Sequence, residues 1–504
     1  MNYILSIDVG TTALKTALFD KEGKLLAQSS REYKLLTPTA LSVELEVETY
    51  WAAFREGVGA VLNLAKVDPE KIRALGISAQ GETLILIGKD GRPLRNAIVW
   101  LDNRAQEESE ILAKEFGDKA SYKITGQVKI VPTWPASKIL WIKHNEKGTY
   151  SQVNKYLLIE DYFIYRLTGN FVAEGSLLCS TVYWDINTKK WWEGILKFLD
   201  VSIEQLPEIK ESGEPVGTIL PSVAKELGLS PCTVVATGAL DQAAGAIGVG
   251  NIKPGIISEN TGAALAICAT VDKPFVDPQG EMPCHYHGIP DTYMAHTFTS
   301  GGMVLKWFRD SFCQSEHQIA SLTGLDTYDL LSKEAEKAPA GCEGLVMLPH
   351  LSGAMAPEAN PKAKGVFFGF SLLHSKPYFI RAIMEAIACI VQRNLDTLDR
   401  LNIKVNEIRS LGGGSRGRLW NQIKADLTQK PVLTMENEEA ACLGAAILAG
   451  KAVGMFDSIE EACTKMVSIK ERFEPNPANS RVYAKTYENY KKLYEDLCDL
   501  FAKG

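Results

Sequence analysis

The sequence predicts an α/β fold built from two similar halves. Short runs of β-branched and apolar residues alternate with longer helical patterns along the 504 residues, as in α/β proteins. A strand, a turn of Gly and Thr, and a second strand occur near the start of the chain and again just after its midpoint. A Gly- and Pro-punctuated segment at 248–255 separates the halves. At roughly 150 residues per domain, the length predicts about two to four domains.

The first half begins with strand patterns and continues with helices and further strands. The apolar run at 3–9 predicts a buried strand, and the turn at 20–23 predicts a hairpin. The remaining strands are expected at 14–19, 25–30, 75–78 and 83–87, and helices at 47–66 and 105–116.

The second half also places strands before helices. Its strands are expected at 256–258 and 264–269, and its helices at 376–401, 418–428, 438–449 and 482–502. The last helix is amphipathic and is expected to close the fold. We therefore predict two domains, at residues 1–248 and 249–504.

The composition is that of a globular protein and excludes several functional classes. Lys and Arg total 54 and Asp and Glu total 61, and this mildly acidic balance argues against nucleic acid or an anionic membrane as partner. The ten cysteines are dispersed, with no Cys-x-x-Cys pair, which predicts reduced thiols and a cytoplasmic location. No stretch reaches about 18 uncharged apolar residues, so no membrane span is expected.

The segment from Asp8 to Thr12 has the pattern of a phosphate-binding turn. A strand ends in the carboxylate, and the chain then turns at Gly10, next to the hydroxyls of Thr11 and Thr12. Exposed amides in such a turn can hold phosphate oxygens, and Asp8 would hold Mg²⁺ through water. The alternative is an ordinary surface hairpin, and we favour the phosphate site.

Asp241 follows a strand-like run at 233–237 and begins a helix of small residues. A carboxylate in that position can accept the proton of an attacking hydroxyl, or it can simply cap the helix. Glycines at 412–414 precede another helix and would allow a flat ligand such as adenine to approach the backbone, although taken alone they are more typical of a flexible loop. The pair at 301–302 either lines the same cleft or forms a turn.

The segment 77–105 is the candidate substrate site. Gln80, Glu82 and Trp100 combine hydrogen-bonding groups with a flat apolar wall, which suits a polyhydroxylated ligand; a solvated hairpin face is the alternative. His285 and His287 have no third ligand at a recognised metal-binding spacing, so we interpret them as structural histidines.

Taken together and in this order, these motifs resemble the FGGY carbohydrate kinase family of the actin-like and hexokinase-like ATPases. The segment 133–145, with Lys138 and Trp141, is similar to the first family signature but departs from it at Thr133, and 365–385 is similar to the second. The resemblance covers nearly the whole chain. It implies an α/β protein of two ribonuclease-H-like domains flanking a nucleotide cleft, which uses ATP and Mg²⁺ to phosphorylate a sugar or polyol.

The resemblance also implies roles for individual residues. Asp241 would be the general base and Asp8 the carboxylate associated with Mg²⁺. The implied substrate-binding residues are Gln80, Gly81, Glu82, Trp100, Asp241 and Gln242. The implied nucleotide-binding residues are Thr11, Thr12, Thr261, Gly262, Gly301, Gly302, Gly413 and Gly414.

Two positions bear on the substrate. Glycerol kinases carry Arg-Glu, and xylulokinases Met-His, where this chain has Gly81-Glu82. Loss of the long Arg enlarges the pocket, and Glu82 would repel a carboxylate, so we expect a neutral ketose or polyol, such as xylulose. Gluconate and glycerol are the alternatives within the family. A non-catalytic actin-fold regulator, which binds sugar or nucleotide, is the alternative from another class, but it would not need Asp241. The chain is also compatible with a homodimer.

Overall fold

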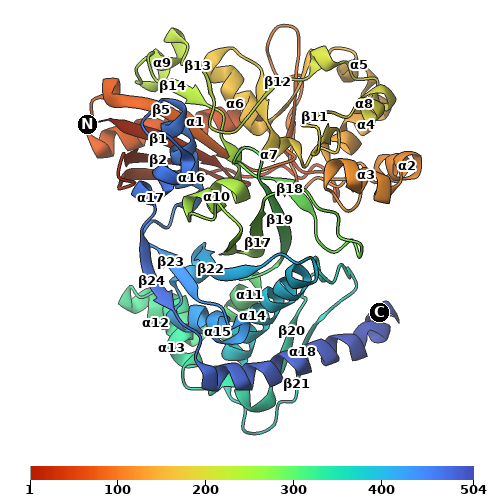
Figure 1. The fold of residues 1–504 in the computed structure, drawn as a ribbon, viewed down its shortest axis with the longest axis vertical. Helices are drawn as coiled ribbons and strands as arrows, with labels where there is room; N and C mark the ends of the chain where they lie inside the picture. The colour runs from red at the N-terminus through yellow and green to blue at the C-terminus, as the bar shows by residue number, and fades with distance from the viewer. Residues whose placement is uncertain (1, 504) are drawn as a thin grey trace.

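The computed structural model describes residues 2–503 and has two lobes, each built around a seven-stranded sheet. Figure 1 shows the lobe of the first sheet above the lobe of the second, with β17 and β19 between them. The predicted α/β fold with two sheet-containing domains is confirmed. No helix in the described part of the chain is both long enough and apolar enough to cross a membrane.

The first sheet has the strand order β13-β14-β5-β1-β2-β3, with β15 also paired to β5. Strands β1, β2 and β3 form an antiparallel meander, and β5 lies parallel to β1 on the side away from β2. The apolar side chains of β1 are buried, as expected for a strand covered on both faces. The bounds are β1 (Tyr3–Val9), β2 (Ala13–Asp20), β3 (Leu25–Glu32), β5 (Ile72–Ala79), β13 (Pro215–Thr218), β14 (Val234–Ala236) and β15 (Ala239–Leu240).

The second sheet repeats this plan in the order β18-β19-β17-β16-β22-β23-β24. Its bounds are β16 (Gly255–Thr261), β17 (Ala264–Val271), β18 (Cys284–Tyr286), β19 (Tyr293–Ser300), β22 (Val405–Leu411), β23 (Val432–Met435) and β24 (Ile469–Phe473). The β16-β17-β19 meander corresponds to β1-β2-β3, and β22 lies parallel to β16 as β5 does to β1. The duplication expected from the two hairpins is therefore present.

Helices cover the first sheet, and smaller sheets extend the lobe. On α1, Tyr50, Phe54 and Val58 are buried at a spacing of four residues and face β2 and β3. The helices are α1 (Val47–Ala65), α2 (Gln106–Phe116), α3 (Asp118–Thr125), α4 (Pro135–Asn145), α5 (Lys147–Tyr150), α6 (Ile159–Thr168), α7 (Gly175–Leu178), α8 (Glu193–Leu199), α9 (Pro221–Leu227) and α10 (Asp241–Gly248). The additional strands are β4 (Glu44–Leu45), β6 (Leu84–Ile87), β7 (Ala97–Ile98), β8 (Lys155–Leu158), β9 (Val172–Glu174), β10 (Trp184–Asp185), β11 (Lys190–Trp191) and β12 (Glu208–Lys210).

The second lobe is organised around the long helix α14, whose middle turns are buried against the second sheet. The helices of the second half of the chain are α11 (Met303–Phe312), α12 (Gln314–Thr323), α13 (Thr327–Ala335), α14 (Lys376–Arg400), α15 (Arg418–Thr428), α16 (Ala440–Ala452), α17 (Ile459–Met466) and α18 (Pro477–Lys503). A separate hairpin comprises β20 (Val346–Pro349) and β21 (Gly365–Phe368). The closing helix α18 begins five residues before the expected start at 482.

Helix α16 belongs to the second half of the sequence but packs in the core of the first lobe. It contacts β1, β5 and α10, and Figure 1 shows it in blue beside these elements. The crossing with α10 is close, because a Cβ atom on Gly444 would lie 1.8 Å from the carbonyl oxygen of Ala244. A glycine is therefore required at this crossing. The strands of each seven-stranded sheet come from one half of the sequence, but α16 comes from the second half and packs on the first sheet. The domain division between 248 and 249 stays a prediction.

Candidate active site

Asp8 lies near the end of β1, directly beside Ser78 on the parallel strand β5. The Ser78 hydroxyl donates a hydrogen bond of 2.8 Å to Oδ1 of Asp8. The following turn is closed by the Gly10 amide, which donates to the carbonyl of Ala13 at 3.0 Å. Burial raises the pKa of Asp8, although the hydrogen bond from Ser78 and the charge of Lys15 oppose this shift. The carboxylate is thus held at the carboxyl edge of the sheet.

Asp241 reaches the same edge from a different part of the chain. Strand β15 pairs in parallel with β5, with Ala239 opposite Ser78, and Asp241 follows as the first residue of α10. Burial raises the pKa of Asp241 to about 7, and the negative charges of Asp8 and Glu82 add to the shift. Three carboxylates therefore lie close enough to interact. A carboxylate with a pKa near neutrality is suited to general base catalysis.

A cavity of about 660 Å³ lies beside Asp241. Trp100 forms part of its wall, and the indole N–H donates to the Thr11 hydroxyl at 2.8 Å. Gln80 also lines the cavity; its amide N–H donates to Tyr50, while its buried Oε1 has no hydrogen-bond partner among residues 2–503. Glu82 stands in the left-handed backbone region, at φ 55°, which is uncommon for a residue other than glycine. The turn between β1 and β2, the indole of Trp100 and the acceptor side chains therefore border one cavity.

The buried side chain of Lys138 hydrogen-bonds to the backbone of this wall. Its side chain is fully buried on α4, and its ammonium donates to the carbonyls of Glu82 at 2.9 Å and Val99 at 3.1 Å. Burial lowers the pKa of Lys138 to about 7, although the charges of Glu82 and Asp102 oppose the shift. Lys138 is therefore a positioning residue for the backbone at Glu82 and before Trp100.

A second cavity, of about 370 Å³, lies between the β16–β17 turn at Thr261 and Gly262 and the glycines that precede α15. Glycines are needed because a Cβ on Gly302 would lie 2.5 Å from the carbonyl oxygen of Gly262, and one on Gly414 would lie 2.6 Å from the Thr261 Cβ. The cavity is lined by Thr261, Gly262, Ala263, Gly302, Met303, Leu305, Lys306, Asp326, Tyr328, Asp329, Ser332, Met384, Gly413, Gly414, Arg416, Gly417 and Trp420. Aromatic and apolar side chains with a few polar groups suit a flat heterocycle.

Most of the site residues expected from the sequence lie at these two cavities. The first cavity is lined by Gln80, Gly81, Glu82, Trp100, Asp241, Gln242 and Thr11, and the second by Thr261, Gly262, Gly302, Gly413 and Gly414. Asp8, Thr12 and Gly301 line neither. Thr12 is exposed, and Gly301 packs so closely on Ala264 that a Cβ would lie 2.5 Å from the Ala264 carbonyl carbon.

Other lining residues were missed at the sequence level. Gln127, His285 and His296 contribute to the first cavity, and Lys306, Tyr328 and Trp420 to the second. Lys306 and Trp420 lie on α11 and α15, the helices that follow the glycines at 301–302 and 412–414. These glycine motifs could therefore have indicated both residues. Gln127 and His296 stand in no recognisable motif.

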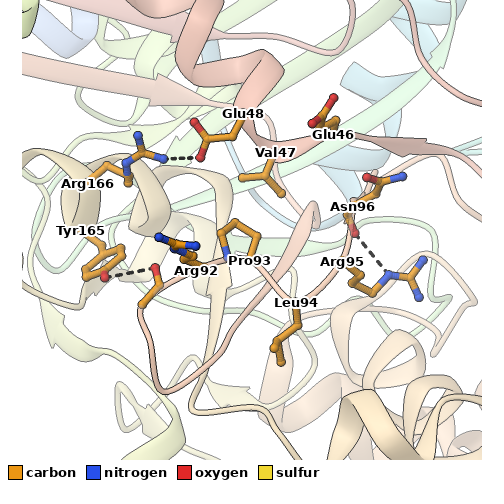
Figure 2. Close-up of a pocket in the computed structure, with 11 residues that line it drawn as sticks. Glu46, Val47, Glu48, Arg92, Pro93, Leu94, Arg95, Asn96, Tyr165 and Arg166 are labelled. Carbon is orange, nitrogen blue, oxygen red and sulfur yellow. Dashed lines mark hydrogen bonds and ion pairs between the residues drawn. The ribbon is translucent and has the colours of Figure 1, made fainter.

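A third cavity, of about 700 Å³, lies in the first lobe and contains none of the expected site residues. Figure 2 shows it between the start of α1, the segment joining β6 and β7, and the end of α6. Two of its charged groups neutralise each other, because Arg166 and Glu48 form an ion pair at 2.5 Å. Although larger, this cavity lacks the converging carboxylates of the Asp241 site.

Comparison with known proteins identifies related families along both halves. The family described as the FGGY family of carbohydrate kinases, N-terminal domain, matches residues 3–248, and its C-terminal domain matches residues 269–453. The chain is 30% identical to a xylulose kinase of Bacillus subtilis (strain 168), covering 99% of this chain and 98% of that protein. It is 31% identical to a gluconokinase of the same organism, covering 96% and 93%.

Solved structures agree with these relationships. A ligand-bound xylulose kinase from Lactobacillus acidophilus superposes with a TM-score of 0.91 at 29% identity, covering all of both chains. A gluconate kinase from the same organism gives a TM-score of 0.90 at 29% identity, covering 100% of this chain and 99% of that one.

Proposed function

The chain belongs to the FGGY family of carbohydrate kinases, and we propose that it phosphorylates a neutral open-chain ketose or polyol, such as xylulose, with ATP. As a member of this family it is a phosphotransferase with an alcohol group as acceptor. The substrate, the roles of single residues and the metal ion belong to the proposal.

The cavity beside Asp241 supports a neutral substrate. Gln80 has a buried oxygen that finds no hydrogen-bond partner in the described part of the chain, and Glu82 adds a carboxylate on the same wall. Acceptors of this kind need donors, which sugar hydroxyls supply and a carboxylate at neutral pH does not. The charges of Asp8 and Glu82 already raise the pKa of Asp241, so a further negative charge would be repelled. This convergence of acceptors carries the proposal.

Asp241 is the proposed general base. Its carboxylate would accept the proton of the substrate hydroxyl while that oxygen bonds to phosphorus. The Trp100 indole N–H, bonded to Thr11, would keep the Thr11 hydroxyl oriented at the first phosphate hairpin. The nucleotide would lie in the second cavity, where Gly413 leaves open space for a flat ring. Catalysis would then rest on positioning and electrostatic stabilisation.

Mg²⁺, which phosphoryl transfer by this family implies, fits beside Asp8. One oxygen of the Asp8 carboxylate accepts from Ser78, and the other has no hydrogen-bond partner within residues 2–503. Over the same residues no group of three or more His, Cys, Asp or Glu side chains is arranged to hold a metal ion. Mg²⁺ is commonly held by one or two carboxylates together with waters and substrate phosphates. When bound, it would neutralise phosphate charge.

A gluconate substrate is the second candidate, because the exposed Lys129 lines the same cavity and could face a carboxylate. The gluconokinase of Bacillus subtilis is as similar to this chain as the xylulose kinase. The absence of a nucleic-acid partner, the cytoplasmic location and the homodimer stay predictions from the sequence.

A panel of xylulose, ribulose, gluconate and glycerol tests the proposal. ADP release is measured for each with ATP and Mg²⁺, and the phosphorylated carbon is identified by NMR. We expect kcat/KM for a ketose to exceed that for gluconate at least about tenfold, which corresponds to about 1.4 kcal/mol. Asp241→Asn should abolish transfer while ATP binding, measured by calorimetry, changes little. A preference for gluconate would overturn the proposed neutral substrate. Full turnover by Asp241→Asn would overturn the assignment of Asp241 as general base.

A further inference from the structure

One wall of the sugar cavity is built by the second sheet together with Gln127, and no role has so far been assigned to it. His285 on β18 and His296 on β19 lie there with their rings perpendicular, at 4.9 Å between centroids. Gln127 follows α3 and lies against His285. Their hydrogen bonds determine which atoms remain free to meet a substrate.

His296 is held in one tautomer. Its Nδ1 lies 3.2 Å from the carbonyl oxygen of Ile267 and 3.3 Å from the sulfur of Cys268. The carbonyl oxygen can only accept, so Nδ1 carries the proton, and the sulfur is a second acceptor for it. Burial lowers the pKa of His296 to about 4, so the ring is neutral at physiological pH. Nε2 is therefore an unprotonated acceptor, and it has no hydrogen-bond partner among the described residues. The ring is partly exposed and lines the cavity.

Gln127 supplies a second acceptor on this wall. Its amide nitrogen donates to the carbonyl of Cys179 at 3.0 Å and lies 3.3 Å from Nε2 of His285. The Cys179 thiol donates to Ser176, so its sulfur accepts from Nδ1 of His285 at 3.3 Å. Nε2 of His285 is then the acceptor for Gln127. Both amide protons of Gln127 are used, which leaves its Oε1 without a partner in the described chain.

We propose that His296 is a specificity-determining residue, whose Nε2 accepts a hydrogen bond from a hydroxyl of the sugar, with Oε1 of Gln127 as a second acceptor on the same wall. The inference rests on the proposed function and deepens it. A substrate must present hydroxyl donors toward β19, and a carboxylate group placed there would meet two lone pairs and gain no hydrogen bond. The wall therefore selects hydroxylated chains over acids, independently of Glu82.

Substrate analogues and His296 variants together test this. The preferred sugar of the panel and its analogues, each lacking one hydroxyl, are compared in the unaltered protein, in His296→Leu and in His296→Gln. For one analogue the unaltered protein should lose about tenfold in kcat/KM, the value of one neutral hydrogen bond. His296→Leu should lose about tenfold on the complete sugar, mainly through KM, and should no longer discriminate against that analogue. His296→Gln keeps an acceptor and should retain most of the discrimination.

His317→Gln is the matched control, because His317 is exposed on α12 and lines neither cavity. The KM for ATP should stay constant in all variants. If His296→Leu fails to fold, His296→Met of similar volume replaces it. Equal analogue ratios in the leucine variant and the unaltered protein would overturn the assignment of His296. A preference for gluconate in the panel would instead overturn the proposed function, so the two failures are distinguishable.

Discussion

Asp8 and Glu259 lie on β1 and β16, the corresponding strands of the two sheets, and each accepts a hydrogen bond from a serine on the adjacent parallel strand. Ser78 donates to Asp8 at 2.8 Å, and Ser410 donates to Glu259 at 2.7 Å. The two acids differ in their charge partners. Glu259 forms a fully buried ion pair with Lys424 at 2.7 Å, whereas Asp8 lies close enough to Asp241 to raise the pKa of that carboxyl. The second sheet therefore carries an acid paired with a buried lysine, and the first carries an acid beside a second carboxylate.

Lys424→Met should therefore destabilise the protein strongly. Removing one partner leaves Glu259 charged and buried without compensation, which typically costs about 3–5 kcal/mol. The free energy of unfolding from urea titration measures this, and the double variant Lys424→Met, Glu259→Gln should recover much of the loss. Lys465→Met, which removes the exposed pair with Glu461, should cost far less, because the remaining charge faces water. Equal costs for the two lysines would contradict the assigned role of the buried pair.

Trp100→Phe should lower kcat about tenfold, because the ring stays but the N–H that bonds Thr11 at 2.8 Å is lost. The matched control is Trp134→Phe, since Trp134 lines the same cavity but donates to the backbone of Lys129 at 2.9 Å. Steady-state kinetics at saturating ATP and sugar separate the two. A kcat that is the same for both variants would refute a role for the Trp100 hydrogen bond in positioning Thr11.

The activity should depend on pH through Asp241. The base acts as the carboxylate, and its pKa is raised to about 7, so the active fraction increases as the pH rises through about 7 and then levels. The measurement is kcat/KM at low concentrations of both substrates, where it reports the free enzyme. An acidic limb with a midpoint near 4 would argue against the elevated pKa.

Substitutions at the adjacent Gly413 and Gly414 should affect nucleotide binding and stability differently. A Cβ on Gly413 meets open space in the second cavity, whereas one on Gly414 would lie 2.6 Å from the Thr261 Cβ. Gly413→Ala should therefore raise the Kd for ATP with no change in Tm. Gly414→Ala should weaken ATP binding and also lower Tm, because the turn at Thr261 must shift. Calorimetry and thermal unfolding measure both, and identical effects of the two substitutions would contradict this assignment.

The α/β class, the duplicated hairpins and most helices could be predicted because they depend on local patterns. The buried run of β1, the four-residue spacing on α1 and the start of α15 at Arg418 are all readable over a few turns or strands. Gln80, Glu82 and Asp241 stood out for the same reason, since each lies where a strand-like run ends and polar groups follow.

The rest depended on contacts between distant segments. Nothing near Lys424 in the sequence distinguishes it from an exposed helical lysine, yet its partner Glu259 stands 165 residues away. His296 and Gln127 line the same cavity only because β19 and the segment after α3 both border it. Local patterns thus determined the elements and the family to which they point. The packing of the two sheets determined which side chains are neutral, paired or left with a free acceptor, because burial and electrostatic coupling arise only when distant residues are brought together.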